Sequence, residues 1–240
     1  MAESDGGTPS AIPLAPLATA RTCSRRAARL RHAAPALQLI VRSVRLTRGT
    51  TDRSKMRMML RRDAAPLDRL PRIRDLYRRH SGLTRALSFG YEEAAAVSLA
   101  ETCSPPTPFV VWARDAARTR ILDWSSPSIR QRRAWANDID RTAAAAYGLA
   151  LAAVEVEFGL VAVARTSTLS GADYYVARPG ESDYLENAFR LEVSGTSSSA
   201  SGRVNERIKN KAAQVYRVGD PSLACVVSFG AFRIIIKVVQ

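Results

Sequence analysis

Apolar positions in the second half of the chain repeat in two places with the spacing of an α-helix. The stretch SSPSIRQRRAWANDIDRTAAAAYGLALAAVEVEFG (125–159) predicts one long helix, with capping residues at its start and Gly159 as its stop. A second helix, RVNERIKNKAAQVY, is predicted over 203–216. Its apolar residues fall on a single stripe, formed by Val204, Ile208, Ala212 and Val215. We expect this stripe to pack against a sheet.

Between the two helices the pattern changes to short runs rich in Val, Ala, Phe and Tyr, which favour strands. Three such runs lie at 159–167, 171–180 and 186–195. After the second helix, the β-branched run at 223–239 predicts one or two strands about Gly230. The element order of helix, three strands, helix, strand predicts an α/β fold for this half.

The first half is less regular. Residues 1–35 combine Pro, Gly, Ser and Arg without a sustained period, which predicts a disordered basic arm. Residues 36–120 are predicted to form a mainly helical basic region, with short helices within 54–80 and a longer one over 82–103. Two segments favour strands, although the first also fits a buried helix: 36–46 and 107–115. The α/β domain is expected to cover 121–240.

The charge of the chain favours polyanionic partners. The formal net charge is +14, and residues 1–120 hold 22 Arg and Lys against 10 Asp and Glu, whereas 121–240 hold 14 against 12. A basic balance of this kind is typical of proteins that bind nucleic acid.

The number and spacing of the cysteines and histidines limit the kinds of site that the chain can form. The three widely spaced cysteines suggest neither a disulfide framework nor a zinc site and fit a reducing compartment. Both histidines lie in the first half, which argues against a histidine-dependent triad in the second. Without a run of about eighteen apolar residues, no membrane span is expected and a cytoplasmic location is predicted. The acid-poor stretch 8–34 also resembles an organelle transit peptide, or a disordered start.

Two acidic residues stand out in the predicted strands. Side chains alternate along a strand, so Arg190, Glu192 and Ser194 share one face. If the strands at 171–180 and 186–195 are neighbours, Asp173 and Glu192 meet on the same face. Two convergent carboxylates repel each other unless a proton or a cation lies between them. Mg²⁺ or Mn²⁺ suits this position, with the Val193 carbonyl as a third oxygen ligand. The alternative for Glu192 is a solvated acid on an open sheet face.

The helix predicted at 203–216 contributes a candidate cationic side chain, Lys211, to this group of acids. Lys211 projects into the apolar stripe, with Arg207 and Gln214 at its borders, whereas Lys209 points toward solvent. A lysine on a packed face needs a partner, because an unpaired buried ammonium is unstable. A carboxylate site that also binds phosphate would supply one, although Lys211 also fits an extended side chain at the helix margin.

These residues resemble the PD-(D/E)xK nuclease superfamily, the restriction-endonuclease-like fold, over about residues 135–240. The resemblance matches the family's strand Asp to Asp173 in SGADYYV and its acid to Glu192 in LEVSG. It matches the helix residues to Lys211 and Gln214 in KNKAAQ. An acid of the first helix contributes in some members, a role that Glu155 or Glu157 would take here. The chain departs from the pattern at Ser194, where the family expects a lysine, and Lys211 is the expected replacement.

The resemblance implies a metal-dependent nuclease that hydrolyses phosphodiester bonds, with DNA as the expected substrate. Asp173, Glu192, Lys211 and Gln214 are the implied catalytic residues, and Arg207 and Arg190 are the candidate contacts to nucleic acid. A homodimer is compatible with the sequence. Two alternatives remain: an inactive module of the same fold that binds nucleic acid or a protein partner, and an interaction subunit that does not bind nucleic acid.

Overall fold

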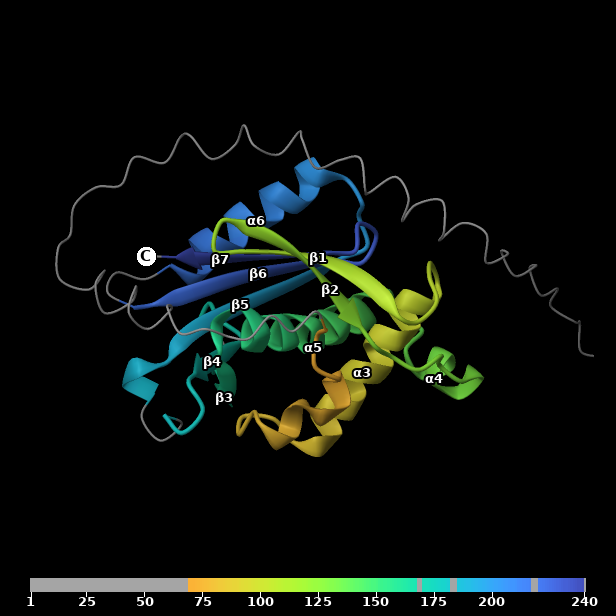
Figure 1. Cartoon of the computed structure of the whole chain (residues 1–240), viewed down its shortest axis with the longest axis horizontal. Coiled ribbons are helices and arrows are strands. Elements are labelled where there is room, and N and C mark those ends of the chain that lie inside the picture. The colour runs from red at the N-terminus through yellow and green to blue at the C-terminus, as the bar shows by residue number, and fades with distance from the viewer. Residues whose placement is uncertain (1–68, 168–169, 182–184, 217–219, 240) are drawn as a thin grey trace, which may run out of the picture.

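The computed structural model describes residues 69–167, 170–181, 185–216 and 220–239 (Figure 1). These residues form one seven-stranded mixed sheet with helices on both faces, so the predicted α/β class is confirmed. The arm predicted at 1–35, the segment at 36–46 and most of the short helices predicted within 54–80 lie outside the described residues.

The described chain contains both helices and strands. The helices are η2 (Ile73–Arg78, a 3-10 helix), α3 (Arg85–Ala100), α4 (Ile129–Ala134), α5 (Asp138–Phe158), η3 (Leu185–Asn187, a 3-10 helix) and α6 (Ser201–Val215). The strands are β1 (Thr107–Ala113), β2 (Ala116–Leu122), β3 (Val161–Arg165), β4 (Tyr174–Ala177), β5 (Phe189–Thr196), β6 (Ser222–Ser228) and β7 (Arg233–Val239). Their order in the sheet is β2-β1-β7-β6-β5-β4-β3. The pairs β1–β7 and β5–β6 are parallel, and the other pairs are antiparallel.

The sheet separates two hydrophobic cores. Helix α6 covers one face, over β5, β6 and β7, whereas α5 covers the other and α3 packs against α5 (Figure 1). Under α6, the predicted stripe of Val204, Ile208, Ala212 and Val215 is buried, mainly against β6. The larger core lies between the sheet, α5 and α3. The 3.6-residue period of α6 therefore identified its packed face correctly.

The single long helix predicted over 125–159 is two helices, which corrects that expectation. Ser128 and Gln131 form a capping box at the start of α4. The chain then turns, and the Asn137 side chain accepts hydrogen bonds from the first backbone N–H groups of α5. Helix α5 ends at Gly159 as predicted, because this residue takes the left-handed conformation (φ 66°) that favours glycine.

The domain boundary predicted between residues 120 and 121 falls inside β2. Strand β1 pairs with β2 on one side and with β7 on the other, so residues from both predicted regions share one sheet. The described part of the region expected to be mainly helical contributes η2 and α3 together with β1 and most of β2. The described residues therefore give no structural break at this position.

Gly195 sets the approach of α5 to β5. A Cβ atom at this position would lie 2.5 Å from the Thr142 carbonyl oxygen and 3.0 Å from the Ala146 Cβ. We expect Gly195→Ala to lower the free energy of unfolding by about 1–3 kcal/mol, since a packed interface must shift to admit the methyl group. Urea unfolding measures this loss.

Gly202→Ala is the matched control, because no atom lies within 4 Å of a Cβ there and alanine favours the α6 helix. Equal stabilities of the two variants would show that the contact between β5 and α5 is looser than described.

Candidate functional site

Alternate residues of β5 face α6 and contact it once per helical turn. Three pairs form this row: Arg190 with the Val215 carbonyl (3.2 Å), Glu192 with Lys211 (2.5 Å), and Ser194 with Arg207 (2.8 Å). The repeat follows from geometry. Two strand residues advance about 6.6 Å and four helical residues about 6 Å, so each step along β5 meets the next turn of α6. The strand and the helix thus align three polar pairs in one interface.

The central pair joins a buried acid to a lysine. Glu192 is 3% exposed, and its Oε1 accepts a hydrogen bond from Lys211 Nζ at 2.5 Å. Lys211 Nζ also donates to Gln214 Oε1 at 2.9 Å, one turn along α6. Lys211 therefore has the carboxylate partner that its place on a packed face requires, and Glu192 is not a solvated surface acid.

Burial and Asp173 change the acidity of Glu192. Burial raises the pKa of Glu192 to about 7, and the nearby Asp173 carboxyl acts in the same direction, while the Lys211 ammonium opposes both. Two carboxyl groups that are close enough to interact compete for a proton or a cation.

Asp173 lies immediately before β4, where β4 meets β5. Its backbone N–H donates to the Leu191 carbonyl at 2.8 Å. Its Oδ2 accepts from the Val193 backbone N–H at 2.8 Å, and its Oδ1 accepts from the Tyr147 hydroxyl of α5 at 2.8 Å. The Asp173 side chain therefore takes the place of a β4 carbonyl beside β5, which brings its charge next to Glu192.

The Val193 backbone carbonyl points into the same region. In an extended strand the N–H and C=O of one residue point to the same side. Because Val193 N–H donates to Asp173, the Val193 C=O is also directed toward β4 rather than β6. The structure thus brings the Asp173 and Glu192 carboxyl groups together and directs the Val193 carbonyl to the same side of β5 as Asp173.

These donors suit a hard divalent cation in type. Among the described residues, no group of three or more His, Cys, Asp or Glu side chains is placed to hold a metal ion. A pair of carboxylates with a carbonyl is the smaller set that Mg²⁺ uses when it keeps several water ligands. Burial is the main cause of the raised pKa of Glu192, and a cation between the two carboxyl groups would relieve the repulsion by Asp173 that adds to it.

Neither acid proposed from the first helix contributes to this site. Glu155 accepts from Arg79 Nε at 2.5 Å and from His80 Nε2 at 3.0 Å. Glu157 is paired with Arg118 and Arg120 of β2. Both acids lie at the C-terminal end of α5, whereas Tyr147, near the middle of the helix, is the residue that reaches Asp173. Their observed contacts are ion pairs that join the two halves of the chain.

The position of Arg190 in the structure does not suit the contact with nucleic acid that was expected from the sequence. It is 4% exposed and donates hydrogen bonds to the carbonyls of Val215 and Ser170. Its guanidinium therefore fastens the end of α6 to the loop before β4. A contact with a phosphate backbone needs a solvent-facing guanidinium, so this expectation for Arg190 is wrong.

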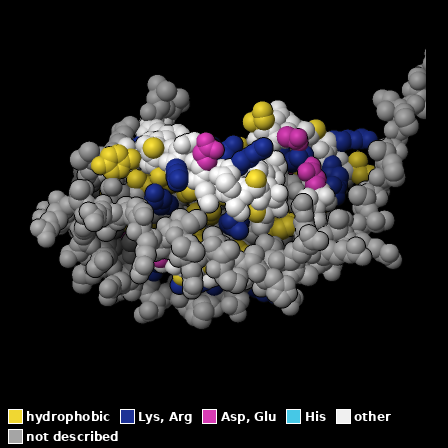
Figure 2. Space-filling view, turned by 90° about the horizontal axis from the view of Figure 1, so that it is seen from above, with side chains coloured by type: hydrophobic (Ala, Val, Ile, Leu, Met, Phe, Trp, Pro, Cys, Tyr) yellow, Lys and Arg dark blue, Asp and Glu magenta, His cyan; other side chains and the backbone are white. Residues whose placement is uncertain are grey.

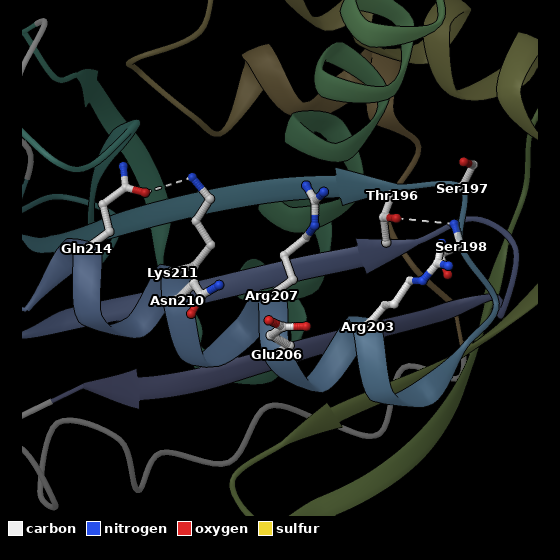
Figure 3. Close-up of a pocket in the computed structure, with 9 residues that line it drawn as sticks. All are labelled: Thr196, Ser197, Ser198, Arg203, Glu206, Arg207, Asn210, Lys211 and Gln214. Atoms are coloured by element: carbon white, nitrogen blue, oxygen red, sulfur yellow. Dashed lines mark hydrogen bonds between the residues drawn. The ribbon is translucent and has the colours of Figure 1, made fainter.

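Arg207, in contrast, is exposed and lines an open groove along α6 (Figure 3). It donates to Ser194 Oγ and to the Gly195 carbonyl, so Ser194, at the position where the family expects a lysine, anchors an arginine instead. The groove is lined by Thr196, Ser197, Ser198, Arg203, Glu206, Arg207, Asn210, Lys211 and Gln214. Lys211 and Arg207 extend toward β5 from the same side of the helix (Figure 3). Lys and Arg side chains recur across the molecular face seen from the α6 side, with acidic ones between them (Figure 2).

Tyr147 is the site residue that the sequence analysis missed. It lies in the alanine-rich run AAAAYGLA, where one aromatic hydroxyl among small apolar residues was the available signal. An amphipathic pattern does not show which tyrosine hydroxyl contacts an acid in a segment distant in the sequence.

Comparison of the chain with protein-family models, with curated proteins and with solved structures gives no match in any of the three. Within the described residues, no helix is both long and apolar enough to cross a membrane. The geometry of the β4–β5–α6 site is therefore the basis for assigning a function.

Proposed function

We propose that the protein is a magnesium- or manganese-dependent nuclease of the restriction-endonuclease-like type that hydrolyses phosphodiester bonds in DNA. The observation that carries the proposal is the convergence of Asp173 at the start of β4, Glu192 of β5 and Lys211 of α6. Glu192 and Lys211 are in direct contact at 2.5 Å, and Asp173 is near enough to raise the pKa of Glu192.

The order and pairing of the elements support the same class. Helix α5 is followed by the antiparallel strands β3, β4 and β5, and α6 then connects β5 to the parallel strand β6. This is the order of helix, three strands, helix, strand that the resemblance implies, with the acids at the start of β4 and within β5.

In this proposal Asp173, Glu192 and the Val193 carbonyl would hold the cation. Bound there, Mg²⁺ would lower the pKa of a coordinated water and polarise a phosphoryl oxygen. Lys211 Nζ stabilises the negative charge that develops on the phosphoryl group, and Gln214 Oε1 keeps that ammonium in place. Water adds to phosphorus, one P–O ester bond breaks, and the products are a phosphate monoester and an alcohol.

The groove along α6 supports a phosphodiester as substrate. Its hydroxyl, amide and guanidinium groups suit phosphate oxygens. The groove adjoins the site, because Lys211 lines the groove and contacts Glu192. Arg203 and Arg207 would bind the phosphates that flank the scissile bond, without reading the base sequence.

Cleavage assays on the purified chain test the proposal. Supercoiled plasmid and labelled single- and double-stranded oligonucleotides are incubated with Mg²⁺, with Mn²⁺ or with EDTA. We expect cleavage with either metal and none in EDTA. Asp173→Asn should reduce cleavage to the level seen in EDTA, because it removes one of the two carboxylates.

Asp115→Asn is the matched control. It makes the same change from acid to amide elsewhere in the chain, and any contaminating nuclease would cleave equally in both preparations. Asp115 is exposed in the turn between β1 and β2, and its left-handed backbone (φ 61°) also suits asparagine. If the Asp173 variant cuts as fast as the Asp115 variant, the proposed site is not responsible for the cleavage.

A second candidate function is an inactive module of the same fold that binds nucleic acid. It is favoured by Ser194, whose hydroxyl anchors Arg207 where the family expects a lysine. This function predicts salt-sensitive binding of DNA without cleavage by either metal. Gel-shift titrations at several salt concentrations, run beside the cleavage assays, separate the two functions.

A further inference from the structure

Both oxygens of the Asp173 carboxylate are held by donors from different elements. Oδ2 accepts from the Val193 backbone in β5, and Oδ1 accepts from the Tyr147 hydroxyl in α5, each at 2.8 Å. The backbone donor is fixed by the sheet. The second oxygen is held by a side chain from the opposite face of the sheet, Tyr147 of α5.

Ring packing fixes Tyr147 itself. Its ring meets the Tyr174 ring edge-on, with centroids 5.7 Å apart, and the Tyr91 ring at a tilt, also at 5.7 Å. The hydroxyls of Tyr91 and Tyr174 are 2.5 Å apart. The exposed Arg165 places its guanidinium over the rings of Tyr147 and Tyr174, at 5.2 and 5.3 Å. Because α3, α5, β3 and β4 each contribute one of these residues, the Tyr147 hydroxyl has little freedom to turn away from Asp173.

We propose that Tyr147 is a positioning residue, which orients the Asp173 carboxylate to bind a divalent cation together with Glu192. This inference rests on the proposed function, because it assigns the donor that prepares one of the metal ligands. A carboxylate oxygen offers about two lone pairs, so the hydrogen bonds from Val193 and Tyr147 leave acceptor capacity on Asp173 for a cation. Such outer donors hold a ligand in its binding orientation before the metal arrives.

The chemistry of a tyrosine suits this position better than that of a lysine. A tyrosine hydroxyl is neutral near pH 7, and here it donates its hydrogen bond to Asp173 Oδ1. A neutral donor orients the carboxylate without cancelling its charge. Lys211, which does carry a charge, contacts Glu192 instead.

Metal titration of the full chain tests the inference. The affinity for Mn²⁺ is measured by isothermal titration calorimetry for the wild type and for Tyr147→Phe, which removes the hydroxyl and keeps the ring packing. We expect Mn²⁺ to bind about 10- to 100-fold more weakly to the variant. In the background of Asp173→Asn, adding Tyr147→Phe should change the Mn²⁺ affinity very little, since its partner is already altered.

Tyr91→Phe is the matched control. It removes another buried hydroxyl from the same ring cluster, bonded to Tyr174 rather than to Asp173. We expect wild-type Mn²⁺ affinity for this variant, even if urea unfolding shows a similar loss of stability for both. A purely structural role would move both affinities alike and would overturn the inference, as would unchanged affinity in Tyr147→Phe.

The two proposals fail in different ways. If the wild type binds Mn²⁺ and cleaves DNA while Tyr147→Phe binds equally well, only the role of Tyr147 is wrong. If the wild type binds Mn²⁺ but never cleaves DNA, the nuclease proposal is wrong, and a weaker affinity in Tyr147→Phe still supports the positioning role. A wild type that binds no Mn²⁺ overturns both.

Discussion

Replacing Lys211 with methionine is expected to slow magnesium-dependent cleavage of DNA about 100- to 1000-fold. Methionine keeps much of the length and apolar character of the side chain but removes its charge. The phosphoryl group then loses the cation that would stabilise its developing negative charge. Glu192 also loses the ammonium that lowers its pKa, so a smaller fraction of Glu192 is ionised near neutral pH. The loss should appear mainly in kcat, measured with saturating oligonucleotide.

Lys209→Met provides the control, because it makes the same change of charge at an exposed position of the same helix. Both variants should bind DNA with similar affinity in Ca²⁺, which separates binding from cleavage. A Lys211 variant that cleaves within a few-fold of the Lys209 variant would remove Lys211 from the chemistry.

Glu192→Gln is expected to change how stability depends on pH. The pKa of Glu192 is raised from 4.5 to about 7 by burial and by Asp173, so between these values the folded chain holds a proton that the unfolded chain has lost. Raising the pH through this window therefore favours unfolding, by about 3 kcal/mol over the whole window. Below pH 4.5 both states are protonated, and above pH 7 both are ionised, so the effect is confined to the window.

The glutamine variant should lack this decline in stability. Urea unfolding of the metal-free protein at intervals from pH 5 to pH 8 measures it, with the wild type compared at each pH. Glu181→Gln, at an exposed position, should follow the wild type. Parallel curves for the wild type and Glu192→Gln would show that Glu192 titrates normally.

Local sequence pattern predicted the elements that surround the site. The period of α6 identified its buried stripe, and the same helical wheel directed Lys211 inward and Lys209 outward. Strand alternation placed Glu192 on the side of β5 that faces α6. These predictions succeeded because each depends on a repeat of two or about 3.6 residues within one element.

Contacts between segments far apart in the sequence could not be predicted from repeats within one element. The pairing of β1 with β7 joins residues that are more than 120 positions apart, and no local pattern predicts this pairing. The same limit hid the contact between Tyr147 and Asp173. It also led to the expectation that Glu155 or Glu157 would join the site. Spacing along α5 does not show that Glu155 pairs with Arg79 after η2, or that Glu157 pairs with two arginines of β2.

The place of β1 beside β7 limits how the protein can be shortened. A fragment that begins at residue 121 would keep every proposed site residue but would lose β1, and the backbone N–H and C=O groups on that side of β7 would have no partner. The uncovered strand, RIIIKVV, is rich in isoleucine and valine. Such an unprotected edge strand is a template for intermolecular strand pairing and aggregation, so a minimal folded fragment has to retain β1 and β2.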